Sequence, residues 1–176
     1  MVAARRAAAL AFVATAVAIA ACGSTAGHAR LVPGRSGVDV VPPVRLTVRR
    51  LDGSSLEIPS LRGHPVLLFV FLTYDGMSQA SLDLLRRFVR EHPEVRVVGV
   101  AAQPHARALL EAWAASLEPP FEVTHDEGGT VAAGTSDLGR IDAVPAFFAL
   151  DARGRLVGRH VGLPTMATLR ALWAAP

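Results

Sequence analysis

The chain has 176 residues, of which 51% are hydrophobic and 19% are charged, so it can form the core of one folded domain and is not a disordered tail. All 18 basic residues are arginine, which excludes chemistry that depends on lysine, such as Schiff-base formation or the lysine of a phosphate-binding loop. The net charge is only +3 and the arginines are scattered along the sequence, so no nucleic-acid partner is predicted.

The first 21 residues have the pattern of a secretory leader. Arg5 and Arg6 form a positive start, and residues 7–21 are an alanine-rich apolar run that is too short for a comfortable membrane span. The leader runs into residues 19–23, IAACG, which resemble the bacterial lipobox, so we expect cleavage before Cys22 and lipidation of that residue. An ordinary signal peptide cut at the same place and an uncleaved N-terminal anchor helix are the alternatives.

Lipidation would use the thiol of Cys22, which is the one cysteine of the chain. Acyl chains on Cys22 would anchor the protein firmly, since each buried CH₂ group contributes about 0.8 kcal/mol. We therefore expect a protein of the cell envelope, tethered to a membrane and facing the periplasm or the cell exterior. Gly23 stands where an aspartate often retains lipoproteins in the inner membrane, which favours the outer membrane in a double-membrane bacterium. A single cysteine also allows no internal disulfide, CxxC pair or cysteine-based zinc site.

Residues 22–44 are predicted to be a flexible tether, because glycine, proline and small residues dominate and no helix or strand periodicity appears. Regular patterns follow, so we expect one folded domain at residues 45–176. The domain begins with a predicted β-hairpin. Residues 44–49 alternate apolar and charged side chains, an Asp-Gly pair forms the turn, and a short strand returns at 56–58.

The rest of the domain alternates strands and helices. Further strands are predicted where apolar runs are bounded by turn residues, at 65–74, 95–102, 121–123, 146–150 and 156–161. Helices are predicted from apolar stripes at 78–92, 104–117 and 164–174, and a glycine- and alanine-rich helix is predicted at 128–138. The helix at 104–117 is expected to turn inward Leu109, Leu110, Trp113 and Leu117. This order predicts a mixed α/β sandwich in which residues 66–101 contain a parallel pair of strands.

Three segments resemble the thioredoxin-like superfamily, and within it the membrane-anchored TlpA-type and redoxin domains. Residues 51–68, with DG and then LRGHPVLL, resemble their entry pattern (DG, then L-x-G-K-P-V-L-V). Residues 144–156 (VPAFFALDARGRL) resemble their Val-Pro strand segment, and Gly162 resembles a glycine before the last helix. The resemblance covers roughly residues 45–175. It implies a thioredoxin-like fold, which is a mixed central sheet flanked by helices with an N-terminal β-hairpin, and a cis-proline at Pro145.

In the resembling families, a CxxC pair lies where the first central strand meets its helix. Counting from Phe71, Gly76 and Gln79 occupy the positions of the two cysteines. Thiol–disulfide exchange needs a thiolate at the helix N-terminus and a second thiol that releases the mixed disulfide, and neither residue supplies one. The family therefore implies a thiol–disulfide oxidoreductase, whereas these two positions predict a degenerate site without that activity.

The helix start and the proline segment remain as a candidate binding site. Its predicted members are Tyr74, Asp75, Met77, Ser78, Val144 and Pro145. In the resembling families the residue before the proline pairs with the main chain of a substrate peptide, which is the role expected of Val144. A purely structural role is the alternative for Pro145, and helix capping is the alternative for Asp75 and Ser78.

Two functions are compatible with these residues. The first is a lipid-anchored, non-catalytic module that binds a peptide or protein partner in the envelope. The alternative is an accessory component of an envelope thiol–disulfide oxidoreductase or cytochrome-maturation system, acting with a cysteine-bearing partner. A relic without a ligand is the third reading. None of them needs a cofactor or a metal, and the adjacent residues His125, Asp126 and Glu127 are interpreted as a turn, because neighbouring side chains rarely converge on one ion.

Overall fold

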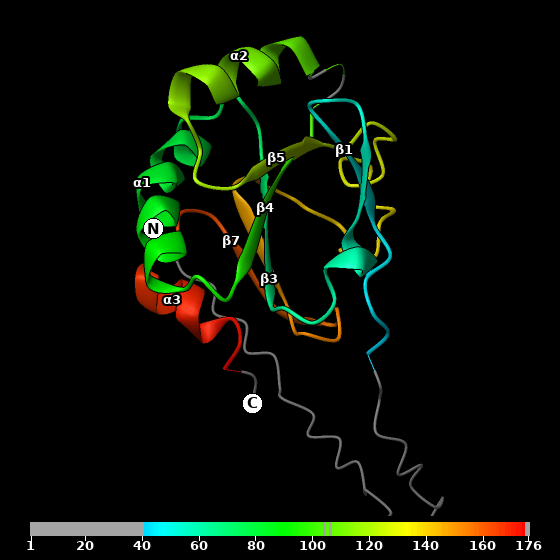
Figure 1. Cartoon of the computed structure of the whole chain (residues 1–176), viewed down its shortest axis with the longest axis vertical. Coiled ribbons are helices and arrows are strands. Elements are labelled where there is room, and N and C mark those ends of the chain that lie inside the picture. Colours follow the sequence, from blue (N-terminus) through cyan, green and yellow to red (C-terminus); the bar gives the residue numbers. More distant parts are fainter. Residues whose placement is uncertain (1–40, 104, 106, 175–176) are drawn as a thin grey trace, which may run out of the picture. The chain divides into compact units, whose positions relative to one another are not determined.

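A seven-stranded mixed β-sheet runs through the part of the chain that the structure, a computed structural model, describes: residues 41–103, 105 and 107–174 (Figure 1). The strands are β1 (Thr47–Arg50), β2 (Ser55–Glu57), β3 (Val66–Phe71), β4 (Arg96–Ala101), β5 (Glu122–His125), β6 (Ala146–Leu150) and β7 (Leu156–Val161), in the order β2-β1-β5-β4-β3-β6-β7. Strands β3, β4 and β5 are parallel, and the other neighbouring pairs are antiparallel. This arrangement confirms the predicted mixed sheet, its parallel pair and its N-terminal hairpin.

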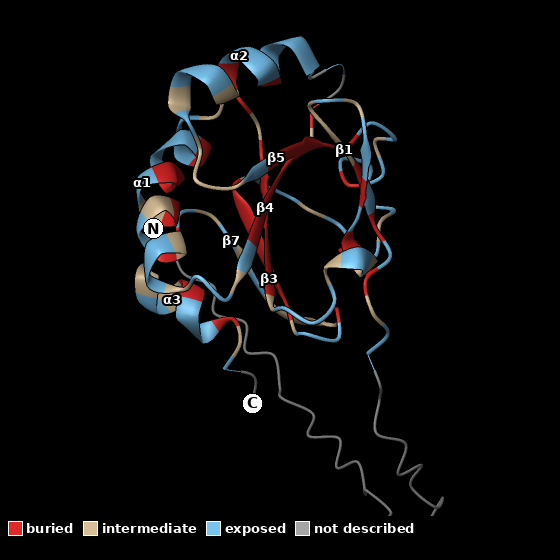
Figure 2. Ribbon diagram, viewed as in Figure 1, coloured by how far each residue is buried: buried red, intermediate tan, exposed pale blue. Residues whose placement is uncertain are grey.

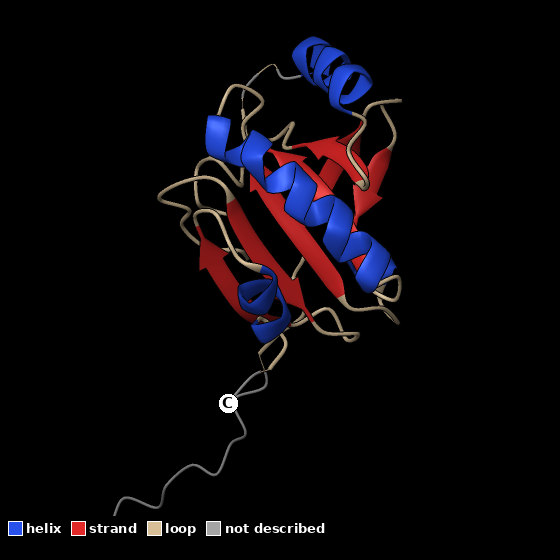
Figure 3. Cartoon of the chain, turned by 90° about the vertical axis from the view of Figure 1, so that its left-hand side faces the viewer, coloured by secondary structure: helices blue, strands red, loops and turns tan. Residues whose placement is uncertain are grey.

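The α-helices of the described residues cover one face of the sheet (Figure 3). They are α1 (Gly76–Glu91), α2 (Arg107–Leu117) and α3 (Met166–Ala171), and a short 3-10 helix, η1 (Ile58–Leu61), follows β2. The core beneath these helices is built around Phe69 of β3, whose ring stacks on the rings of Phe71 and Phe147 at centroid distances of 5.0 and 5.2 Å. Leu85 of α1 and Leu110 of α2 are buried in this core.

The opposite face of the sheet is covered by extended chain, turns and the short helix η1 rather than by α-helices. There Leu68 and Val70 of β3 belong to a second core, to which the loop between β5 and β6 contributes Val131 and Leu138. Because successive side chains of a strand point to opposite faces, β3 is buried on both sides (Figure 2). Its unbroken apolar run predicted this central position correctly.

The helix predicted at residues 128–138 is wrong. A series of turns occupies this segment, and Gly129 and Gly134 within it adopt φ angles of +66° and +70°, in which an α-helix cannot continue. The Asp126 carboxylate holds the first turn by accepting hydrogen bonds of 3.0, 2.8 and 3.1 Å from the backbone N–H groups of Thr130, Val131 and Ala132. The segment therefore contributes buried side chains without forming a helix.

One inward residue predicted for the second helix is also wrong. Leu109 is 61% exposed, whereas Leu110 and Trp113 face the core. Residues three apart share one face of a helix, and Leu109 is rotated from Leu110 by about 100° around the helix axis. Leu117, also predicted to face inward, is half-buried at the end of α2.

The folded unit begins before the predicted boundary at residue 45. Pro43 forms an isolated β-bridge with Arg155, and the buried Val44 donates its backbone N–H to the carbonyl of Gly154 at 2.8 Å. The last two residues of the predicted tether therefore belong to the domain.

The leader predicted at residues 1–21, the lipidation site at Cys22 and the tether up to residue 40 lie outside the residues that the structure describes. Lipid anchoring thus stays a prediction from the sequence. Among the helices of the described part, none has the length and the apolar character needed to cross a bilayer.

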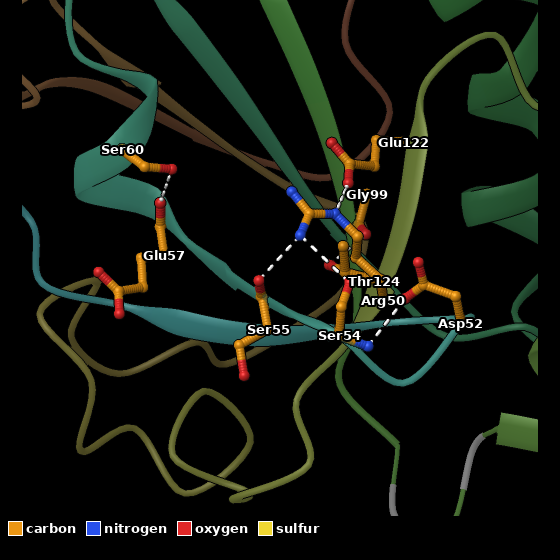
Figure 4. A network of polar contacts seen from close by, with 9 residues as sticks. All are labelled: Arg50, Asp52, Ser54, Ser55, Glu57, Ser60, Gly99, Glu122 and Thr124. Atoms are coloured by element: carbon orange, nitrogen blue, oxygen red, sulfur yellow. Dashed lines mark hydrogen bonds and ion pairs between the residues drawn. The ribbon is translucent and has the colours of Figure 1, made fainter.

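Arg50 fixes the N-terminal hairpin to the sheet (Figure 4). Its guanidinium donates to the backbone oxygen of Ser55 at 2.8 Å and to the hydroxyl of Ser54 at 3.3 Å, and it pairs with the carboxylate of Glu122 on β5. The Asp52 carboxylate accepts a hydrogen bond of 2.8 Å from the backbone N–H of Ser54 and closes the turn. One cation therefore joins the hairpin to β5.

We expect Gly158→Ala to destabilise the fold, because a methyl group on Gly158 of β7 would lie 2.1 Å from the carbonyl oxygen of Leu172 at the end of α3. Overpacking of this kind lowers the free energy of unfolding by about 1–3 kcal/mol. Gly76→Ala is the matched control, since a methyl group there meets no atom within 4 Å. Urea unfolding of the full-length chain measures both, and equal stability of the two variants would contradict the close approach of α3 to β7.

Candidate functional site

The candidate site begins where β3 ends and α1 starts. Asp75 is the N-cap of α1, and its Oδ2 accepts hydrogen bonds of 2.7 Å from both the backbone N–H and the hydroxyl of Ser78. Ser78 is fully buried, so its hydroxyl is not available to a ligand or a substrate. The capping alternative therefore holds for both residues, and neither is a free polar group of a binding surface.

The two positions that correspond to the cysteines lie on the first turn of α1. Gly76 is exposed and is the first residue of the helix. Gln79 is exposed too, and its side-chain Nε2 donates to the carbonyl oxygen of Thr73 at 2.9 Å. Position 76 therefore has no side chain that could act as a nucleophile. Position 79 has an amide, which is bound to the backbone of the loop before the helix.

A buried hydrogen-bonded pair supports this loop from behind. The backbone N–H and the hydroxyl of Thr73 donate to the Oε1 of Gln103 at 2.8 and 3.0 Å, and both side chains are buried. The loop between β3 and α1 is thus held by Gln79 on its outer side and by Gln103 on its inner side. The sequence analysis did not identify Gln103, which lies 30 residues from Thr73 in the chain.

The proline segment lies beside this loop. The peptide bond between Val144 and Pro145 is cis, Pro145 is buried and Val144 is half-buried. In the antiparallel pairing of β3 with β6, Val70 stands opposite Ala146, so Val144 and Pro145 run alongside the residues that lead into α1. Neither the N–H nor the C=O group of Val144 makes a hydrogen bond to any described residue. The backbone of Val144 is therefore unpaired among the described residues.

Exposed apolar side chains surround this backbone. Tyr74 is 72% exposed and Met77 is 48% exposed at the start of α1. On the other side, Val161 pairs with Ala146, and the N–H of Gly162 donates to the Pro145 carbonyl at 2.8 Å, which places the exposed Leu163 next to the proline. We call the surface formed by these residues the docking face. It consists of Tyr74, Met77, Val144, Val161 and Leu163.

Two members of the docking face, Val161 and Leu163, were not predicted from the sequence. Residues 156–161 were expected only as a return strand and Gly162 as a family feature, although an apolar residue on each side of that glycine was a usable signal. Within the described residues, no three His, Cys, Asp or Glu side chains are grouped closely enough to hold a metal ion.

Together the mixed sheet, the helix start and the cis-proline segment define a thioredoxin-like fold with glycine and glutamine at the two cysteine positions. No family model matches the sequence, and no curated protein matches it either. The comparison that succeeds is with solved structures, and it confirms the predicted fold class.

Three of these structures illustrate the likeness. StoA from Bacillus subtilis is 18% identical with a TM-score of 0.59, and the alignment covers 75% of this chain and 98% of that one. A secreted disulfide oxidoreductase of Mycobacterium tuberculosis homologous to E. coli DsbE is 20% identical with a TM-score of 0.56 and coverages of 74% and 92%. Etrx1, the exposed lipoprotein thioredoxin of Streptococcus pneumoniae, is 20% identical with a TM-score of 0.60 and coverages of 73% and 97%.

We expect Asp75→Ala to lower the free energy of unfolding by about 1–3 kcal/mol, because it removes the cap of α1 and leaves the buried hydroxyl of Ser78 without its acceptor. Asp75→Asn keeps an acceptor oxygen and should retain most of the stability. Urea unfolding of both variants checks this. An Asp75→Ala variant as stable as the unchanged chain would show that the carboxylate does not act as a cap.

Proposed function

We propose that this protein is a non-catalytic module of the cell envelope that binds an extended segment of a peptide or protein partner on the docking face. The observation that carries the proposal is the free N–H and C=O of Val144 between exposed apolar side chains. A peptide lying along this backbone would gain main-chain hydrogen bonds, as in β-strand addition.

The affinity of such a complex comes from non-covalent contacts. Burial of apolar surface contributes roughly 25 cal/mol per Å², and Tyr74 and Met77 offer the most exposed apolar side chains at the helix start. Tyrosine and methionine are enriched at protein interfaces. No mixed disulfide can trap the partner, because positions 76 and 79 carry no thiol. The partner is therefore held reversibly.

The proposed location follows from the leader. The lipobox-like residues before Cys22 predict a lipid anchor, and the following tether would hold the domain away from the membrane surface. Two of the similar structures support a location outside the cytoplasm, since one is of a secreted protein and the other is of an exposed lipoprotein. We propose a membrane-tethered domain that faces the periplasm or the cell exterior.

Site-specific photo-cross-linking of the full-length chain in its native host tests the proposal. A benzophenone probe at Tyr74 should give a discrete adduct, and the same probe at Arg90, an exposed residue farther along α1, should give none. Leu163→Asp should abolish the adduct, because it places a charge in the docking face. Leu109→Asp is the matched control, since Leu109 is also exposed and lies on α2.

The absence of an adduct at Tyr74, or equal adducts at Tyr74 and Arg90, would overturn the docking face as a binding site. Loss of the adduct in both aspartate variants would show that it depends on surface charge in general. The folded state of each variant is checked by circular dichroism before cross-linking.

An accessory role in envelope thiol–disulfide exchange is the second candidate. It is favoured by the open first turn of α1, where a side chain on Gly76 would meet no atom within 4 Å. A helix N-terminus also lowers the pKa of a thiol placed there. In this role the domain would present bound segments to a cysteine-bearing partner, which performs the exchange.

The double variant Gly76→Cys/Gln79→Cys tests whether the scaffold still supports exchange. With dithiothreitol as the reductant, we expect it to reduce insulin disulfides faster than the unchanged chain. Gly76→Cys alone should be much slower than the double variant, because no second thiol releases the mixed disulfide. A double variant no faster than the unchanged chain would show that the active-site geometry is lost and would remove the support for the second candidate.

A further inference from the structure

A cavity of about 790 Å³ opens at the carboxyl ends of the parallel strands β4 and β5. Three separate segments contribute to it, namely the β1–β2 hairpin, Ala102, Gln103 and His105 after β4, and the loop that follows β5. Its polar lining residues include Arg49, Gln103, His105, Arg107, His125 and Glu127. In open α/β sheets, ligands bind in the crevice outside the carboxyl ends of the strands, and the volume lies within the range of small-molecule sites.

The buried part of the lining carries a polar group without a partner. His125, the last residue of β5, is 8% exposed, and its Nε2 is buried and makes no hydrogen bond to any described residue. Most buried polar atoms in proteins are paired with protein, water or a ligand, and a lone one calls for an explanation. An occupant of the cavity that reaches His125 would supply the missing partner.

Gln103 offers a second hydrogen-bonding group to the same cavity. Its Oε1 is already used by the N–H and hydroxyl of Thr73. The side-chain amide N–H groups of Gln103 make no hydrogen bond to any described residue, so they remain free to donate to a ligand. Gln103 is 4% exposed, and it lines the cavity together with His125.

Two guanidinium groups meet at the hairpin end of the cavity. Nη1 of Arg49 donates to the carbonyl of Gly53 at 3.3 Å. A methyl group on Gly53 would lie 3.8 Å from Nη1 of Arg107, so both cations approach the same turn. Arginine side chains recognise carboxylates and phosphates through charge-assisted hydrogen bonds.

The acidic groups near the cavity are already engaged. Glu127 pairs with Arg49 at 2.6 Å, and the Asp126 carboxylate accepts three backbone N–H groups. Hydrogen bonds from Ser54 lower the pKa of Asp52 in the hairpin turn, and the charges of Arg50 and Arg107 lower it further. The groups that the cavity offers to an occupant are therefore mainly hydrogen-bond donors.

We propose that this cavity binds a small organic acid. The carboxylate of the ligand would meet the guanidinium of Arg107 beside that of Arg49, and an acceptor group on its body would meet Gln103 and His125. The wall between these groups consists of small residues, Ala102, Gly128, Gly129, Ala132 and Ala133, which leave room for the body of the ligand. The site is separate from the docking face and does not rest on the proposed function.

Citrate is a suitable probe for calorimetric titration of the full-length chain, with uncharged glucose as the control ligand. We expect citrate to bind and Arg107→Met to weaken its affinity about tenfold, the loss of one charge-assisted contact. Arg87→Met is the matched control. Arg87 on α1 is 58% exposed and pairs with a glutamate four residues on, just as the 59% exposed Arg107 does on α2.

A second variant probes the buried end of the site. His125→Phe should also weaken citrate binding, whereas His160→Phe should not, although His160 carries an unpartnered buried Nε2 as well. No heat of citrate binding at millimolar concentration, an equal effect of Arg87→Met and Arg107→Met, or binding of glucose as tight as that of citrate would each overturn the proposal. Cross-linking at Tyr74 is expected to be unchanged in Arg107→Met, so failure of this site and failure of the docking face are distinguishable.

Discussion

The burial of β3 on both faces is the constraint on which the rest of the structure depends. Its odd-numbered residues, such as Phe69, need the three helices as cover, and its even-numbered residues, such as Leu68, need the chain before β1 and the loop after β5. Because α1 follows β3 after four residues, the depth of β3 in the sheet also sets the position of the helix start. The pairing of β3 with β6 then brings Val144 beside it.

Three side chains fix the shape of the candidate site through hydrogen bonds. Asp75 caps the helix, Gln79 closes the loop on its outer side and Gln103 on its inner side. In an exchange-active domain the side chains at the first turn must stay free to react. Here position 79 is tied to the backbone, so the loop is organised for a constant shape rather than for a reaction. The amide of Gln79, which cannot carry out thiol–disulfide exchange, thus also stabilises the loop beside Val144.

The sequence predicted the parts of this fold that are local. The apolar run of β3, the stripe of α1 and the Val-Pro segment each have a pattern of their own, and counting from Phe71 located Gly76 and Gln79. The glycine- and alanine-rich segment 128–138 forms turns instead of the predicted helix, because two of its glycines adopt positive φ angles. Gln103 and the surroundings of His125 could not be predicted, since each depends on strand register between segments far apart in the sequence.

The amide of Gln103 joins the two regions of the molecule through its own geometry. A side-chain amide is planar, so its oxygen and nitrogen cannot turn independently. Thr73 presents a backbone N–H, which can only donate, and this fixes the oxygen of Gln103 toward the loop and leaves the nitrogen without a partner among the described residues. A reversed amide would set donor against donor. In the proposed site, a ligand that reaches Gln103 would therefore have to accept a hydrogen bond from it, because the N–H of Thr73 decides which atom of the amide is left over.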